Sequence, residues 1–135
     1  MRQRVPTGNP WGDTLGYSRA VRQGALIFVA GTTATGPDGR PLAPGDPAAQ
    51  TRIVFERIEM ALRQLGGSLR DVVDTKIYLT NIEDWPQVGG VHGEVFREIK
   101  PAATMLAVTR LIDPGMLVEI SAVALLEDER MKERI

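Results

Sequence analysis

The sequence predicts an α+β domain, in which a mixed β-sheet carries two helices on one face. Short apolar runs bounded by glycine and proline are typical of strands, and two longer segments repeat apolar residues at helical spacing. These segments follow one another in the order ββαβαββ. Because 135 residues without an internal linker suit one domain, we assign residues 1–135 to a single domain, with 1–14 as an N-terminal arm and 126–135 as a charged tail.

The first two strands are expected to form a hairpin. The runs GYSRAV (16–21) and ALIFVAG (25–31) are separated by the polar turn RQG. The following segment, 32–45, is rich in proline and glycine and shows no helical or strand periodicity. We therefore expect an irregular loop between the hairpin and the first helix.

Two amphipathic helices are expected. The first begins at Asp46, a side-chain cap followed by proline at the first helical position, and ends at the glycine pair 66–67. The second runs from about 84 to 98 and ends before Lys100–Pro101. Its apolar stripe consists of Trp85, Val88, Val91, Val95 and Ile99. We expect Trp85 and Phe96 to belong to the core.

A strand is expected between the two helices. Ser68 and Asp71 have the spacing of a short capping turn, and VVDTKIYLT (72–80) follows them. The alternation of this segment places one set of side chains on the same face of the sheet: Val73, Thr75, Ile77 and Leu79.

The last two strands are expected to form a second hairpin around the turn Asp113–Pro114–Gly115. The runs TMLAVTRL (104–111) and MLVEISAVAL (116–125) flank this turn. Both runs are apolar on their two faces, as is ALIFVA, whereas two helices cover only one face of a sheet. A partner subunit is the economical cover for the second face, so we expect an obligate homo-oligomer.

Glu119 is the one carboxylate inside MLVEISAVAL, and alternation puts it on the face that awaits a partner. A carboxylate in such a place needs a cation, hydrogen-bond donors or a bound water. One interpretation is a structural ion pair across the interface, with Arg19 or Arg110. The other is a carboxylate that orients a hydrolytic water or binds a ligand. Periodicity alone favours the ion pair.

Composition argues against several classes of partner. Sixteen Lys and Arg against seventeen Asp and Glu give a net charge of −1, and no basic run stands out, so we expect no nucleic acid. The chain has no cysteine, no long apolar run and no apolar core of a signal peptide, which indicates a cytoplasmic protein without a membrane partner.

His92 is the only histidine, so no metal or cofactor is expected. We favour a packing or surface role for it over that of a proton donor.

The chain resembles the Rid family, also called the YjgF family, whose best-known members are small trimers that hydrolyse reactive imines and enamines. The resemblance extends from about 16 to 125 and rests on the order and spacing of its segments: GYSRAV with FVAGT, GGSLRDVVDTKIYLTNIEDW, HGEVF, KPAAT and LVEISAVAL. It implies a chorismate-mutase-like trimeric barrel, with clefts between adjacent subunits that hold small ligands.

The resemblance also implies site residues. Tyr17 matches a tyrosine that lines the cleft, Gly31 matches a backbone contact to the ligand, and Glu119 matches the glutamate that holds the attacking water. Thr104 and Met105 fall at lining positions. Tyr17 and Glu119 are therefore the catalytic candidates, and the others are candidates for substrate binding.

The chain departs from this pattern at Ala103. Deaminating members carry there an arginine that clamps the substrate carboxylate, and a methyl group cannot make that bidentate contact. Gly89 likewise stands where some members have asparagine. We expect weak activity on 2-imino acids, and the sequence leaves open whether Arg19 or Arg110 supplies a displaced clamp.

Three functions follow from these observations. The first is a homotrimer with small-ligand clefts that hydrolyses imines or enamines with altered specificity. The alternative is a trimer that binds small ligands or regulates without turnover. Some members of the family have been labelled ribonucleases or translation inhibitors, and the balanced charge argues against that third function.

Overall fold

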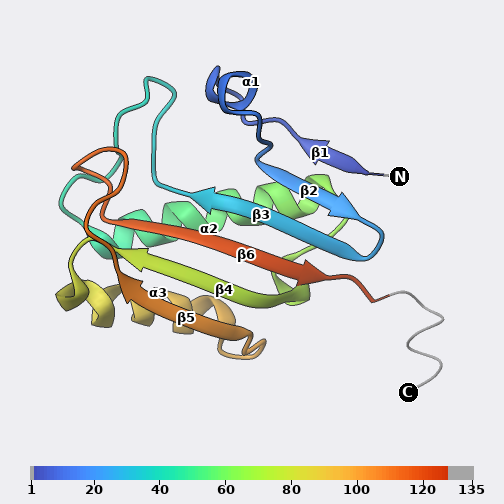
Figure 1. Cartoon of the computed structure of the whole chain (residues 1–135). Helices are drawn as coiled ribbons and strands as arrows, with labels where there is room; N and C mark the ends of the chain where they lie inside the picture. Colours follow the sequence, from blue (N-terminus) through green and yellow to red (C-terminus); the bar gives the residue numbers. More distant parts are fainter. Residues whose placement is uncertain (1, 128–135) are drawn as a thin grey trace.

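The computed structural model describes residues 2–127, which form a mixed sheet with both long helices behind it in the view of Figure 1. The strands lie side by side in the order β1-β2-β3-β6-β4-β5. The elements are β1 (Gln3–Val5), α1 (Trp11–Leu15), β2 (Ala20–Gln23), β3 (Leu26–Thr32), α2 (Pro47–Gln64), η1 (Leu69–Asp71), β4 (Val72–Leu79), η2 (Ile82–Asp84), α3 (Trp85–Phe96), β5 (Ala102–Ala107) and β6 (Val118–Leu125).

This architecture confirms the predicted α+β class with helices on one face of a mixed sheet. From β2 onward the strands and long helices follow the expected order ββαβαββ. Residues 1–14, expected to be an arm, contain β1 and most of α1, and β1 pairs with β2 at the edge of the sheet. Most of the expected tail, 126–135, lies outside the described residues.

The capping residues set the ends of α2 and η1 as predicted. The Asp46 side chain accepts the backbone N–H of Ala49 at 3.0 Å, and Pro47 occupies the first turn. Gly66 adopts a left-handed φ of 86°, which lets the chain leave the helix. Ser68 and Asp71 form a capping box at η1.

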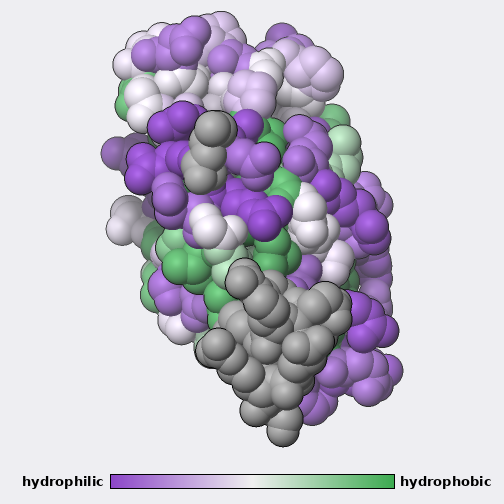
Figure 2. All heavy atoms as spheres, turned by 90° about the vertical axis from the view of Figure 1, so that its right-hand side faces the viewer, coloured by the Kyte–Doolittle hydropathy of each residue, from purple (hydrophilic) through white to green (hydrophobic). Residues whose placement is uncertain are grey.

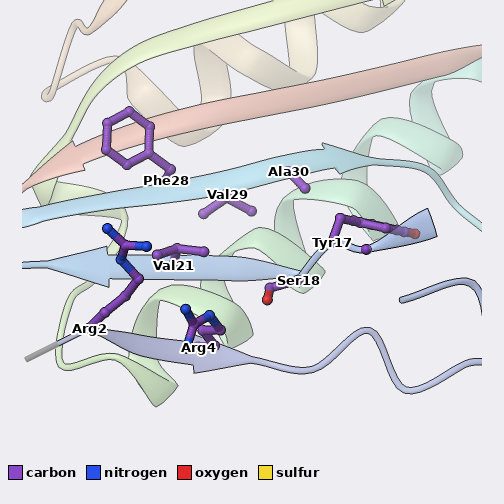
Figure 3. A pocket seen from close by; sticks show the side chains of 9 residues that line it. Arg2, Arg4, Tyr17, Ser18, Val21, Phe28, Val29 and Ala30 are labelled. Atoms are coloured by element: carbon purple, nitrogen blue, oxygen red, sulfur yellow. The ribbon is translucent and has the colours of Figure 1, made fainter. Parts of the chain in front are cut away.

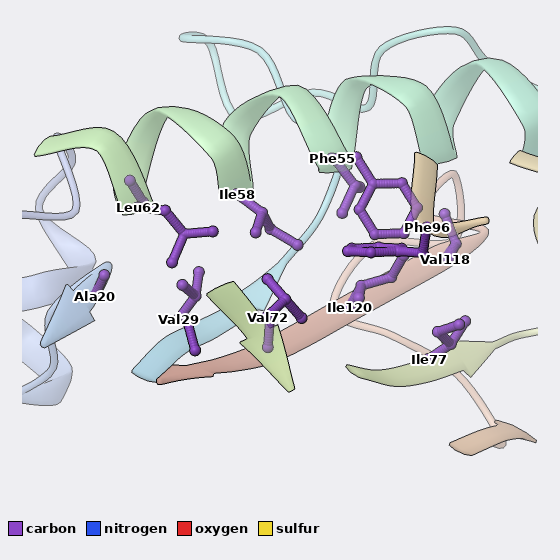
Figure 4. Packing of buried hydrophobic residues seen from close by; sticks show 14 of the residues in the cluster. Ala20, Val29, Phe55, Ile58, Leu62, Val72, Ile77, Phe96, Val118 and Ile120 are labelled. Atoms are coloured by element: carbon purple, nitrogen blue, oxygen red, sulfur yellow. The ribbon is translucent and has the colours of Figure 1, made fainter. Parts of the chain in front are cut away.

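The core lies between the helices and the sheet. Figure 4 shows Phe55, Ile58 and Leu62 pointing from α2 toward the strands, where Ile77 and Ile120 meet them. Trp85, by contrast, is 58% exposed, so its predicted place in the core is wrong. It is the first residue of α3, and the buried stripe of that helix begins one turn later, at Val88. Phe96 is buried as predicted.

The predicted hairpin of the last two strands is wrong. β5 pairs with β4 in parallel, with Ala103 opposite Thr75, and β6 lies between β3 and β4, antiparallel to both. The physical reason is the crossover through α3, which returns the chain to the start of β4 and makes β5 parallel. β6, the more apolar strand, takes a central place, and β5 becomes an edge.

Val73 is a second departure from the predicted pattern. The pairing of β4 with β6 shifts between Val72 and Asp74, and this bulge turns Val72 into the core while leaving Val73 44% exposed. A one-residue shift exchanges the faces of a strand, so the alternation predicted from the sequence holds only after the bulge, from Thr75 on.

The other face of the sheet carries no helix. In β6 the residues Val118, Ile120, Ala122 and Ala124 are buried, whereas Glu119 and the residues alternating with them are partly exposed. Figure 2 shows hydrophobic atoms gathered among hydrophilic ones in the lower half of the molecule. Several large apolar side chains remain exposed on the strands: Leu26, Phe28, Leu106 and Leu125. The uncovered face that the sequence predicted is therefore present.

No helix within residues 2–127 has the length and apolar character needed to cross a bilayer.

Gln50 connects α2 to the turn that leads into β6. Its side chain is fully buried, its Nε2 donates to the Gly115 carbonyl at 2.9 Å, and its Oε1 accepts the Leu117 N–H at 3.0 Å. These bonds hold the backbone just before Glu119.

Replacing Gln50 by alanine should lower the free energy of unfolding by about 2–4 kcal/mol, because two buried backbone groups lose their partners. Urea denaturation at one protein concentration measures this loss. Gln64→Ala, at an exposed position of the same helix, is the matched control and should change stability by less than about 0.5 kcal/mol. Equal effects of the two substitutions would contradict the role given to Gln50.

Candidate functional site

A bulge in β3 brings Gly31 against Glu119. The pairing of β3 with β6 runs from Leu26–Leu125 to Val29–Ala122 and resumes at Thr32–Ile120, so β3 has one extra residue here. A Cβ at position 31 would lie 2.9 Å from both Cδ and Oε2 of Glu119. Only glycine leaves this space, and the carboxylate therefore packs directly on the backbone of β3.

Arg19 contacts the same residue, Gly31, through the carbonyl of Gly31. Its N–H donates to the Val5 carbonyl at 2.8 Å and its carbonyl accepts the Ala30 N–H at 3.0 Å, which places it in the ladder just before β2. Its Nη2 donates to the Gly31 carbonyl, and its guanidinium carbon lies 6.0 Å from the centre of the Tyr17 ring. The fold thus brings Tyr17, Arg19, Gly31 and Glu119 together within one protomer.

A second arginine lies near this cluster. Arg57 of α2 donates from Nη1 to the Thr33 carbonyl at 3.2 Å, just after β3 ends. The positive charge of Arg57 repels that of Arg19 and so contributes to lowering the pKa of Arg19, although burial has the larger effect. Two guanidinium groups therefore meet where β3 leaves the sheet.

The carboxylate of Glu119 is half-buried and forms no ion pair with a cation of residues 2–127. Burial raises the pKa of Glu119, and the charge of Arg19 partly offsets that rise. Periodicity suggested an ion pair across a subunit interface, with Arg19 or Arg110. One copy of the chain does not form it within residues 2–127, and a pair with a second copy stays a prediction. A carboxylate in this state has free acceptor oxygens for a water or a ligand.

The remaining candidate residues lie on β5, on two different faces. Thr104 is in register with Lys76 and shares the face of Glu119, two strands away. Ala103 and Met105 are in register with Thr75 and Ile77, whose side chains point to the helices. Within one protomer, Ala103 and Met105 therefore lie on the opposite face from Glu119.

Met105 lies beside α3. A Cβ at Gly89 would lie 3.9 Å from the Cε of Met105, so the glycine stands next to this side chain. Gly89 and the exposed Ala103 thus flank Met105 at the free edge of the sheet. Neither residue has a side chain that could donate a hydrogen bond to a ligand.

Tyr17 lines a shallow groove on the open side of the sheet. The groove has a volume of about 390 Å³, and Figure 3 shows Val21, Phe28 and Ala30 along it with Arg2 and Arg4 at one end. Tyr17 is 39% exposed here. Because Tyr17 and Ala30 border both the groove and the cluster around Arg19, a ligand in the groove would adjoin the Glu119 region.

The side chain of His92, a residue of α3, packs against β4 and α2. Its Nε2 is 2.9 Å from the Thr75 hydroxyl, and its ring centre lies 5.8 Å from that of Phe55 and 4.7 Å from that of Phe96. Burial lowers the pKa of His92. This environment matches the packing role, on the helix side of the sheet and away from Glu119. Within residues 2–127 no three acidic, histidine or cysteine side chains gather as metal ligands would.

Sequence reasoning missed two neighbours of the site. Tyr78 is in register with Glu119 on β4, and Arg57 reaches the end of β3 from α2. Tyr78 could have been found had β6 been placed beside β4 instead of β5. No local pattern signals Arg57, because its place depends on how α2 packs on the sheet.

Comparisons with known proteins bear on the identity of this fold and site. A model of the family described as Endoribonuclease L-PSP matches residues 12–126. The crystal structure of Rv2704 from Mycobacterium tuberculosis, a member of the YjgF/YER057c/UK114 family, superposes with a TM-score of 0.85 and 48% identity, covering 93% of this chain and 100% of that one.

Two curated relatives extend the comparison. The 3-aminoacrylate deaminase RutC of Acinetobacter baylyi is 36% identical over 108 residues, which cover 80% of this chain and 85% of RutC. An uncharacterized protein of Streptomyces coelicolor is 35% identical over 122 residues, 90% of each chain. The fold is the chorismate-mutase-like fold, and the chain belongs to the Endoribonuclease L-PSP family, also called the YjgF or Rid family.

Proposed function

We propose that this chain forms a homotrimer that hydrolyses the C=N bond of small imines, or of the enamines that tautomerise to them, in clefts between its subunits. The observation that carries the proposal is the Glu119 carboxylate, half-buried against the backbone of Gly31 and without an ion pair to any cation of residues 2–127. The similarity to a 3-aminoacrylate deaminase supports the same class of reaction.

The proposed reaction needs one carboxylate and one water. Glu119 accepts a proton from the water as the water oxygen bonds to the imine carbon, and it passes that proton to the imine nitrogen. In the carbinolamine that results, Glu119 takes the hydroxyl proton and transfers it to the nitrogen as the C–N bond breaks. Ammonia leaves, a carbonyl compound remains, and Glu119 is again ionised. The partial burial of Glu119 raises its pKa, which suits a group that both accepts and donates a proton.

The open face of the sheet supports the trimer. Phe28, which lies on this face in β3, is 48% exposed. β5 is an edge strand exposed along most of its length. Apolar surface of this kind is typical of an interface. A second copy would also bring its own Ala103 and Met105 within reach of Glu119, which one protomer cannot do because they lie on opposite faces.

The substrate we propose lacks a carboxylate anchor at the position that other deaminases clamp. Ala103 is exposed and has no donor, and Gly89 beside Met105 has none either. The part of the proposed cleft on the β5 side is therefore lined by small, neutral groups, which favours uncharged imines over 2-imino acids. The same observation supports the second candidate function, a trimer that binds a small ligand without turnover.

Glu119→Gln separates the two functions, because it keeps the shape of the side chain and removes its basicity. For the deaminase, we expect the wild type to accelerate hydrolysis in a screen of imines generated in solution, and the variant to lose kcat by about 100-fold or more. Glu56→Gln, at an exposed position of α2, is the matched control and should leave kcat unchanged. No turnover by either protein across the screen would favour the ligand-binding trimer.

Ala103→Arg tests the specificity. The wild type should show weak kcat/KM on 2-iminobutanoate, and the variant should gain about 10- to 100-fold, since a charged hydrogen bond to the carboxylate is restored. Ala102→Arg puts the same side chain one residue away, on the other face of β5, and should give no gain. Strong wild-type activity on this substrate would show that the carboxylate needs no clamp at 103.

Phe28→Lys tests the assembly. Sedimentation velocity should give a trimer for the wild type and smaller species for the variant, because a charge would be placed in the covered face. Met60→Lys changes a side chain that is 61% exposed on α2 and should remain trimeric. A wild-type monomer in dilute solution would contradict the proposed cleft.

A further inference from the structure

Two donors of Arg19 point into the protein. Nη2 donates to the Gly31 carbonyl, and Nε is sealed from solvent with no hydrogen-bond partner among residues 2–127. The side-on fork of a guanidinium consists of these two nitrogens, and it is the fork that grips a carboxylate with two parallel bonds. Since that fork is closed, Arg19 cannot grip a substrate carboxylate through it.

One peptide unit separates Arg19 from Glu119. The carbonyl of Gly31 accepts from Arg19, while its Cα faces the carboxylate so closely that a Cβ would lie 2.9 Å from Oε2. The two opposite charges thus interact through protein, where attraction is stronger than across water. Both are partly buried, and neither forms a closer ion pair within residues 2–127.

The other charged and titratable groups near Glu119 come from the strands on both sides of β6 and from α2. On the β4 side, Tyr78 is in register with Glu119, and Lys76, opposite Ser121, is bound to Asp74 at 3.1 Å. On the β3 side, Tyr17 stacks near Arg19, and Arg57 donates to the Thr33 carbonyl. Arg19 is the cation whose charge acts on the carboxylate, opposing the rise in the pKa of Glu119 that burial causes.

From this arrangement we infer that Arg19 is a positioning residue, a positive charge bonded to the Gly31 carbonyl that favours the ionised form of Glu119 and holds it in place. The inference rests on the proposed function for its catalytic meaning. Its physical content, the coupling of the two side chains, can be measured without turnover.

The signs of the charges on Arg19 and Glu119 determine how removing Arg19 should shift the pH dependence of activity. Glu119 acts as a base when it is ionised, so activity falls as the pH drops through its pKa. Without Arg19, burial acts unopposed and the pKa of Glu119 rises further. The acidic limb of the profile then moves to higher pH, and activity is lost at pH values where the wild type still works.

The experiment compares Arg19→Gln, Arg19→Lys and Arg70→Gln in the full chain. Carbon-detected NMR titration of the Glu119 carboxyl should give a midpoint at higher pH in Arg19→Gln and a midpoint close to wild type in Arg19→Lys, which keeps the charge. Arg70, exposed at η1, is the control and should leave the midpoint unchanged. Circular dichroism and sedimentation show which variants keep their fold and assembly.

The pH profile of kcat/KM is the second measurement. On its acidic side, Arg19→Gln should lose several-fold more activity than on the alkaline plateau, whereas a merely structural defect lowers both alike. A folded Arg19→Gln protein with a wild-type titration midpoint overturns the inference, whether or not the protein turns over imines. A shifted midpoint in a protein that hydrolyses no imine supports the coupling and contradicts only the proposed deaminase.

Discussion

The whole site depends on the absence of a side chain at Gly31. The bulge in β3 brings this residue opposite β6, and the Glu119 carboxylate fills the space that a Cβ would need. The carbonyl of the same residue accepts from Arg19. One residue without a side chain thus brings a carboxylate and a guanidinium to the same stretch of β3. A bulge beside a site is a common means of aiming side chains, and here it aims two of opposite charge.

The topology divides the candidate residues between the faces of the sheet. β5 is parallel to β4 because α3 carries the chain back, and this register turns Ala103 and Met105 toward the helices while Thr104 shares the face of Glu119. No motion of one rigid sheet brings residues on opposite faces together. In the proposed trimer, each cleft would therefore combine the β3–β6 region of one copy with the β5 edge of another. The exposed apolar face and the exposed edge would then serve one purpose, since covering them would also complete the site.

Much of this fold could be predicted from local patterns, and the errors have a common cause. The limits of α2, the capping box at Ser68 and the alternation of β6 around Glu119 follow from side chains within a few residues of each other. The pairing of β5 with β4, the bulge that exposes Val73 and the exposure of Trp85 depend on how distant segments meet. The site shows the same division: the sequence indicated Tyr17, Gly31 and Glu119 through a family resemblance, whereas the place of Arg57 and Tyr78 required the packing of α2 and the strand order.

The placement of charge gives the proposed chemistry its character. An arginine in front of a substrate raises affinity for anions, whereas an arginine behind the base acts on the base alone. In this chain the guanidinium near Glu119 is bonded to the Gly31 carbonyl with Nε sealed from solvent, and the proposed substrate side of β5 would present a methyl group at Ala103. In the proposed reaction a neutral imine adds no charge beside Glu119. A 2-imino acid would bring a second carboxylate toward Glu119, and without a cation at position 103 the repulsion would raise the pKa of the base that must accept the proton. The placement of charge in the proposed site therefore favours uncharged substrates.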